Sequence, residues 1–232
     1  MRLIIGNKRA DGFTGAFRHR HHLLYSDADG NPLTAWQVQE IVAGKRVLIG
    51  VHGLASENTK TKNAYEHLHS KLIDCNYDVM FGYRWAAGFS VGGYDFARGR
   101  TDEAADGLAE LIAQTTLADS VVVMGHSLGC DVVLKASVIC RDLFPLARAW
   151  KGTVLVAPAI WWDRELPWQT TVCFSPNDKA LKAMRARSFW TKKPMGLYGP
   201  KPGIVCRREE FDYDHSDYFD DPRARAVLRE AT

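Results

Sequence analysis

The sequence predicts an α/β protein whose mostly parallel β-sheet is covered by helices on both faces. Short runs of β-branched and aliphatic residues alternate with longer stretches of helical character, the order that crossover helices between parallel strands produce. Four of the five clearest runs are almost continuously apolar, as strands covered on both faces are. The chain has 232 residues, 46% hydrophobic and 25% charged, which is enough to bury a substantial core. Since no linker interrupts it, we expect one domain over residues 1–232.

The individual elements follow from periodicity and from end signals. Strands are predicted at residues 46–51, 77–83, 120–125, 152–157 and 171–174. The stretches 61–74, 101–115 and 128–143 are each long enough to cross over as helices, and the middle one has an apolar stripe at helical spacing. A last helix is predicted over 222–230, with Asp221 as its N-cap and Pro222 at its first position. Residues 3–5 and 22–25 are expected to form an early antiparallel edge, together with a turn at 29–32.

Charge and cysteine content argue against several classes of protein. The chain has 30 Lys and Arg against 27 Asp and Glu, a net charge of +3 spread along its length, so no nucleic-acid partner is expected. The densest basic stretch, residues 18–22, contains three histidines without a fixed acidic or cysteine partner, and we expect a solvated loop and no metal site there. Five cysteines without a C-x-x-C pair argue against a disulfide framework and a zinc site. With neither a signal peptide nor an apolar run long enough to span a membrane, we expect a cytoplasmic protein without membrane insertion.

The strongest chemical signal is the segment Gly-His-Ser-Leu-Gly at residues 125–129, which directly follows a predicted strand and precedes a helical stretch. A strand that turns abruptly into a helix forces the central residue, Ser127, into a strained conformation above the sheet. Glycines on both sides are needed because Cβ atoms there would collide with the neighbouring strand and helix. The N-terminus of the helix puts positive partial charge where an oxyanion would form, and the backbone N–H of Leu128 is the expected donor.

In this strand–turn–helix context the chain resembles the α/β-hydrolase family over roughly residues 46–230. The resemblance implies an α/β-hydrolase fold with a short cap loop and no metal or organic cofactor. After the strand at 46–51, the sequence His52-Gly53-Leu54 matches the oxyanion-hole loop of the family, which implies the N–H of Leu54 as the second donor. The family orders its triad as nucleophile, acid and histidine, which implies Asp178 as the acid and His215 as the base.

These residue types fit a nucleophilic mechanism. A serine hydroxyl is a poor nucleophile at neutral pH, so His215 is expected to take the proton of Ser127 and to return it to the leaving group. Asp178 is expected to orient the imidazole and to stabilise its charged form. Asp163, which follows the preceding strand, is the alternative acid.

Other polar residues near these motifs are given supporting roles. His52 and His126 flank backbone groups of the motifs, and we expect them to support these groups without transferring protons. A solvated acidic loop is expected around His215, formed by Asp212, Asp214 and Asp217.

Two aromatic loops are candidates for the walls of a substrate pocket. The loop 84–96 contains Trp85 and follows a strand at its carboxyl end, where α/β sheets bind ligands. The loop 158–168 contains Trp161 and Trp162 and lies where the family inserts its cap, but about a dozen residues are too few for a folded lid. Simple packing of these tryptophans onto the sheet is the alternative. The residues 83–85 and 102–105 also resemble, more weakly, uncharacterised serine hydrolases of bacteria and phages.

The combined features predict a carboxylesterase that acts on a small-molecule acyl substrate of short to medium length. A thioesterase, lipase or amidase would use the same triad, so the sequence leaves these activities open. A non-catalytic binding module with this fold is the alternative from another class, although degraded motifs would then be expected. Oligomeric state is not encoded in any of these patterns.

Overall fold

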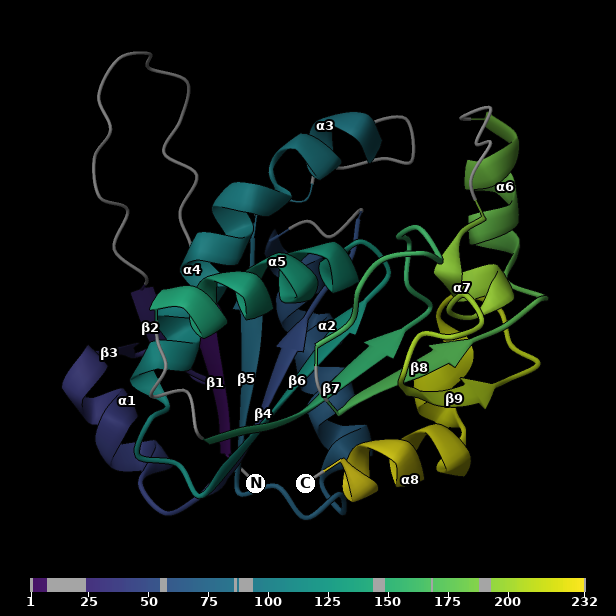
Figure 1. Ribbon diagram of the computed structural model, residues 1–232. Coiled ribbons are helices and arrows are strands. Elements are labelled where there is room, and N and C mark those ends of the chain that lie inside the picture. Colours follow the sequence, from purple (N-terminus) through teal and green to yellow (C-terminus); the bar gives the residue numbers. More distant parts are fainter. Residues whose placement is uncertain are drawn as a thin grey trace.

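The computed structural model describes residues 2–7, 24–54, 58–85, 87, 94–143, 149–167, 169–187 and 193–231. Within these residues, nine strands form one sheet in the order β3-β2-β1-β5-β4-β6-β7-β8-β9 (Figure 1). The basic stretch 18–22 and most of the aromatic loop between residues 85 and 94 lie outside the described residues, as does Trp168.

The sheet is mostly parallel, as the sequence predicts. The parallel strands are β1 (Arg2–Asn7), β4 (Arg46–Val51), β5 (Val79–Arg84), β6 (Ser120–His126), β7 (Trp150–Val156), β8 (Thr170–Phe174) and β9 (Arg207–Glu210). At one edge β2 (Leu24–Asp27) pairs antiparallel with β1, and β3 (Pro32–Leu33) pairs antiparallel with β2. The predicted antiparallel edge is therefore present, and the turn near residue 30 joins β2 to β3.

Helices cover both faces of the sheet. One face carries α1 (Ala35–Val42), α4 (Thr101–Gln114) and α5 (Gly129–Leu143), with α4 and α5 side by side over the strands (Figure 1). The other face carries α2 (Asn58–Leu72), the 3-10 helix η3 (Asp217–Asp220) and α8 (Pro222–Glu230). The shorter helices are α3 (Tyr94–Gly99), α6 (Lys179–Arg187) and α7 (Met195–Tyr198). No helix in the described ranges combines the length and the apolar composition needed to cross a bilayer.

The apolar strands supply two separate cores because successive side chains point to opposite faces. In β6, Val121 and Val123 join the core beneath α4 and α5, whereas Val122 and Met124 join the core beneath α2 and α8. Leu48 in β4 likewise packs on the side of α2. A strand buried on both faces needs an uninterrupted apolar run, which is why β4 and β6 were recognisable from the sequence.

The topology determines where the chemistry gathers. The segments that follow β4, β6 and β8 all leave the sheet at the carboxyl ends of parallel strands, the edge at which α/β sheets bind ligands. They contain the His52–Leu54 loop, Ser127 and Asp178, respectively. Residues more than a hundred positions apart therefore meet at one edge.

Candidate active site

The turn from β6 into α5 holds Ser127 in a strained backbone conformation. Its φ is 55°, in the left-handed region that a residue with a Cβ atom enters at a cost of about 1–2 kcal/mol. Backbone hydrogen bonds hold it there, two of them to residues outside the turn. The N–H of Ser127 donates to the carbonyl of Val156 at 2.9 Å, and its carbonyl accepts from the N–H of Ala159 at 3.1 Å. The side chain is buried at this turn, with 4% of the residue exposed.

Two glycines let the loop after β4 lie directly against this turn. A Cβ atom on Gly53 would lie 2.6 Å from the Cβ of Ser127, closer than real Cβ contacts allow. A Cβ atom on Gly129 would lie 2.5 Å from the carbonyl oxygens of both Val51 and His52. The predicted oxyanion loop is thus in van der Waals contact with the residue predicted as nucleophile, and only glycine fits at either position.

Asp178 and His215 are brought together by the ends of β8 and β9. The Nδ1 of His215 lies 2.6 Å from Oδ2 of Asp178, whose side chain is fully buried. The other carboxylate oxygen accepts the N–H of Leu181 at 2.8 Å, so Asp178 also caps the N-terminus of α6. This fixes the carboxylate and occupies Nδ1, which leaves Nε2 of the imidazole to exchange a proton. The alternative acid, Asp163, is exposed and forms no contact with His215 in the described structure.

The acidic loop around His215 is exposed at Asp212 and Asp217, as the sequence suggests, and hydrogen bonds also fasten it. Oδ1 of Asp214 accepts the N–H of Lys179 at 3.1 Å and the N–H of His215 at 2.9 Å. The hydrogen bond from His215 is the main reason why the pKa of Asp214 is lowered. Asp212 accepts a hydrogen bond from the side-chain amide of Asn177. These bonds fasten the loop that carries the histidine to the loop that carries Asp178.

His126 connects the turn to the same histidine. Its Nε2 lies 2.8 Å from the carbonyl oxygen of His215, and the two ring centroids are 4.9 Å apart. Burial lowers the pKa of His126 to about 4, and the positive charge of a protonated His215 lowers it as well. The ring is therefore neutral at neutral pH, and its proton lies on Nε2, which donates to the carbonyl of His215.

Of the two residues predicted as oxyanion donors, Leu128 follows Ser127 in the chain, and Leu54 follows its contact Gly53. Leu128 is buried, whereas Leu54 ends the loop after β4 and is half-buried. Within the part of the chain that the structure describes, neither backbone N–H donates to another residue. Both amides are thus unoccupied by protein acceptors there.

The three predicted pocket tryptophans have different surroundings. Trp85 is buried, with 6% exposed, and its polar groups contact the loop after β4. Trp161 and Trp162 are half-buried. The backbone N–H of Trp162 donates to the carbonyl of Lys193 at 2.9 Å. The ammonium of Lys193 lies 4.4 Å from the ring centre of Trp162, and the guanidinium of Arg98 lies 5.4 Å from that of Trp161. Cations cover both rings, and the cap loop is fastened to the segment before α7.

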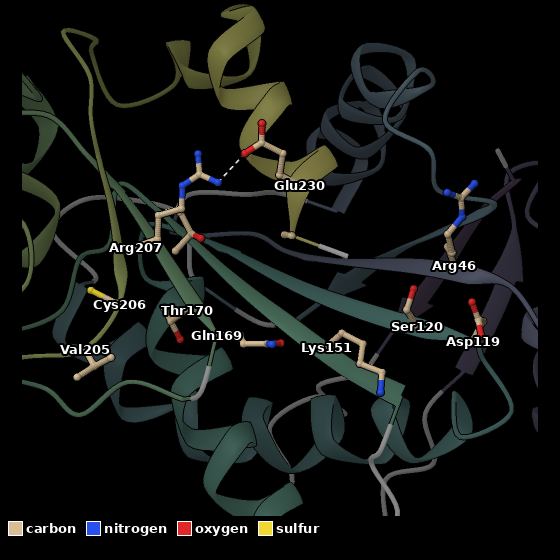
Figure 2. A pocket seen from close by; sticks show the side chains of 12 residues that line it. Arg46, Asp119, Ser120, Lys151, Gln169, Thr170, Val205, Cys206, Arg207 and Glu230 are labelled. Atoms are coloured by element: carbon tan, nitrogen blue, oxygen red, sulfur yellow. Dashed lines mark hydrogen bonds and ion pairs between the residues drawn. The ribbon is translucent and has the colours of Figure 1, made fainter.

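Of two cavities among the described residues, neither is lined by Ser127, Asp178 or His215. An open cavity of about 910 Å³ lies at the amino ends of the strands (Figure 2). Ser127 follows the carboxyl end of β6, at the opposite edge of the sheet. Its lining includes the first residues of several strands together with the end of α8, among them Arg46, Ser120, Lys151, Thr170, Arg207 and Glu230. None of the predicted site residues lines it. Beside Leu128, between α3, α5 and the cap loop, lies a cavity of about 10 Å³, room for one water molecule.

In the described ranges, no three His, Cys, Asp or Glu side chains are placed to hold a metal ion together.

Comparisons with known proteins agree with the architecture. A family model described as an alpha/beta hydrolase of unknown function (DUF900) matches residues 33–189, a segment that includes Ser127 and Asp178 but ends before His215. No curated protein matches the sequence significantly. Lipase B of Aspergillus fumigatus is 13% identical with a TM-score of 0.50, over 81% of this chain and 52% of that chain. A cutinase-like protein from Cryptococcus sp. is 12% identical with a TM-score of 0.48, over 82% and 94% of the two chains. The RedJ thioesterase of Streptomyces coelicolor is 12% identical with a TM-score of 0.48, over 81% and 85%.

Proposed function

Because this chain belongs to the alpha/beta hydrolases of unknown function (DUF900) and has the alpha/beta-hydrolase fold, we propose that it is a serine hydrolase that cleaves carboxylic esters through an acyl-enzyme. The observation that supports this most is the 2.6 Å contact between Nδ1 of His215 and the buried carboxylate of Asp178. A histidine oriented in this way, at the same sheet edge as a strained serine, is the arrangement that activates a hydroxyl nucleophile.

In the proposed mechanism, Oγ of Ser127 attacks the ester carbonyl carbon while Nε2 of His215 takes the hydroxyl proton. The carbonyl oxygen becomes an oxyanion that accepts hydrogen bonds from the N–H groups of Leu54 and Leu128. When the tetrahedral intermediate collapses, the bond to the alkoxy group breaks and His215 gives its proton to the departing alcohol. A water molecule then attacks the acyl-enzyme with the same proton transfers, which releases the acid and restores Ser127.

Asp178 has a passive but necessary part in these steps. Its carboxylate keeps the proton of the neutral imidazole on Nδ1, so that Nε2 has a free lone pair. It also stabilises the imidazolium that forms when the serine proton is taken up. The hydrogen bond from the N–H of Leu181 keeps the carboxylate in place during both half-reactions.

The cap loop supports the assignment of short to medium acyl substrates. Its described residues are held against the segment before α7 by the backbone hydrogen bond from Trp162 to Lys193. An isolated antiparallel β-bridge between Trp161 and Pro194 adds to this contact. A loop held in this way does not provide the large mobile apolar cover that a long-chain lipase needs. We therefore propose a carboxylesterase active on soluble esters.

The test is covalent labelling with a fluorophosphonate probe, with the Ser127→Ala variant alongside. We expect labelling of the wild-type protein and none of the variant, because the probe reacts with an activated serine. A series of p-nitrophenyl esters from two to sixteen carbons then measures chain-length preference, which we expect to be highest for the short and medium esters. Absence of labelling in a folded wild-type sample would contradict the proposal and favour a binding module.

A further inference from the structure

We propose that Trp85 is a positioning residue that holds the His52–Leu54 loop in the geometry that oxyanion stabilisation requires. This inference rests on the proposed serine-hydrolase function. The indole Nε1–H of Trp85 donates to the carbonyl oxygen of His52 at 2.8 Å, and its backbone N–H donates to Nε2 of His52 at 3.2 Å. The two rings are stacked, with centroids 5.7 Å apart and an angle of 21° between their planes. Trp85 thus contacts His52 at its carbonyl, at its ring edge and on its ring face.

The remaining polar groups of His52 also have partners. Its Nδ1 lies 2.8 Å from the carbonyl oxygen of Gly53, and its backbone N–H donates to the hydroxyl of Tyr65 at 3.0 Å. That hydroxyl donates in turn to the carbonyl of Tyr83 in β5 at 2.6 Å. Since Nε2 accepts from Trp85, only the tautomer with its proton on Nδ1 satisfies both ring nitrogens. Burial lowers the pKa of His52 to about 4, which keeps the ring neutral at neutral pH.

The carbonyl that Trp85 holds is one of the two that contact the turn from β6 into α5. The carbonyl oxygen of His52 packs against Gly129, and the next residue, Gly53, packs against Ser127. A shift of the loop by a few tenths of an ångström would therefore move the N–H of Leu54 relative to the reacting carbonyl. Hydrogen bonds to an oxyanion act through such preorganised geometry. The bond from the indole of Trp85 ends on this same carbonyl oxygen of His52 and restrains the loop at its contact with Gly129.

This role differs measurably from that of a pocket wall, which the sequence suggested for Trp85. A side chain with 6% exposure offers little surface to a substrate. A pocket wall would change substrate affinity and therefore KM. A residue that positions an oxyanion donor changes transition-state stabilisation and therefore kcat.

The test is the Trp85→Phe variant, which keeps an aromatic ring and the backbone N–H but removes the indole donor. With p-nitrophenyl butyrate we expect kcat to fall about tenfold, the effect of losing one hydrogen bond, with KM within about twofold. The dependence of kcat on pH should keep its shape, because the His215–Asp178 pair is untouched. Fluorophosphonate inactivation should slow by the same factor as kcat.

A matched control is available in Trp150→Phe. The indole of Trp150 also donates to a carbonyl, that of Gly152 at 3.0 Å, but at the amino end of β7. We expect this variant to keep the wild-type kcat. Equal melting temperatures of Trp85→Phe and Trp150→Phe would show that the loss of kcat in the former does not reflect general unfolding.

A measurement on the wild-type protein covers the case in which Trp85→Phe fails to fold. Long-range ¹H–¹⁵N spectra of the histidines report which ring nitrogen of His52 carries the proton, and we expect Nδ1. A proton on Nε2 would overturn the inference, because that nitrogen could not then accept from Trp85.

The remaining outcomes separate the two proposals. A wild-type kcat in a folded Trp85→Phe variant, or a change confined to KM, would overturn the positioning role and leave the hydrolase proposal standing. A wild-type protein that neither reacts with the fluorophosphonate nor turns over esters would instead contradict the proposed function.

Discussion

His126 donates a hydrogen bond from Nε2 to the backbone carbonyl of His215 at 2.8 Å, which joins the residue before the proposed nucleophile to the proposed base, 89 positions later in the chain. His215 is held at two further points. Its N–H donates to Asp214 at 2.9 Å, and its Nδ1 lies 2.6 Å from Asp178. The backbone and the ring of the base are thus fixed independently, the first by His126 and Asp214 and the second by Asp178.

The hydrogen bond from His126 to the carbonyl of His215 predicts a graded response of kcat to substitution at His126. In His126→Phe a ring of similar size remains but the donor is lost, so the loop carrying His215 is less restrained and kcat should fall about tenfold. In His126→Gln the side-chain amide can still donate, and kcat should stay closer to that of the wild type. Steady-state kinetics with p-nitrophenyl butyrate provide the comparison. A wild-type kcat in both variants would show that the bond has no part in catalysis.

The neutral histidines predict that stability falls in mild acid. His52 and His126 have their pKa lowered from 6.5 to about 4 in the folded protein. Between these values the unfolded chain binds more protons than the folded one, so the free energy of unfolding decreases as pH falls, by at most about 1.4 kcal/mol per pH unit for each histidine. Urea unfolding at pH 7.5, 6.5, 5.7 and 5.0 measures this slope. It should become shallower in His126→Gln, and the same slope in both proteins would mean that groups other than His126 cause it.

The buried framework of the fold could be predicted from the sequence because its signals are local. The strand observed at Arg46–Val51 has the predicted bounds, and the helix at Pro222–Glu230 begins at its predicted N-cap, Asp221, which accepts the N–H of Arg223. The strand Arg207–Glu210 was not predicted, because the sequence Arg-Arg-Glu-Glu has no apolar alternation. This segment is a strand because it pairs with β8 at the sheet edge, a tertiary effect that overrides its low strand propensity.

The candidate site was predictable to the extent that motifs mark the ends of strands. The motif order proposed Ser127, Asp178 and His215, and the structure places the last two in contact. The contacts of His52 with Tyr65 and Trp85 and that of His126 with His215 could not be predicted, since each joins separate segments of the chain. The helix α1 shows the reverse case: it was not predicted, although Thr34 and Gln37 form a capping box whose spacing is a local signal.

The two candidate acids can be separated by substitution. In Asp178→Asn the cap of α6 is retained because the amide oxygen can still accept, but the amide no longer favours the proton on Nδ1 of His215. We expect kcat to fall about 10⁴-fold, the loss that the same change causes in a serine-protease triad. Asp163→Asn, at an exposed position, should keep wild-type kcat. The opposite result in ester kinetics would assign the acid to Asp163.

The close approach of the oxyanion loop predicts that Gly53 cannot be replaced. In Gly53→Ala the added methyl group would lie 2.6 Å from the Cβ of Ser127, so the loop or the turn must move. We expect loss of ester turnover and a decrease of about 1–3 kcal/mol in the free energy of unfolding. Gly99→Ala is the control, since nothing lies within 4 Å of a Cβ atom there. Gly53→Ala should therefore have a lower melting temperature and a lower ester turnover than Gly99→Ala. An active Gly53→Ala variant would show that the loop is free to move.

The strain at Ser127 predicts that removing its side chain stabilises the protein more than removing its hydroxyl alone. At φ 55°, Ser127→Ala keeps a Cβ atom in the left-handed region, whereas Ser127→Gly enters this region without steric cost. Both variants should lack turnover and fluorophosphonate labelling. Glycine also loses more conformational entropy on folding, which offsets part of the gain, so we expect Ser127→Gly to be more stable than Ser127→Ala by up to about 1 kcal/mol in urea unfolding. If Ser127→Ala were the more stable variant, the turn would not store strain at this residue.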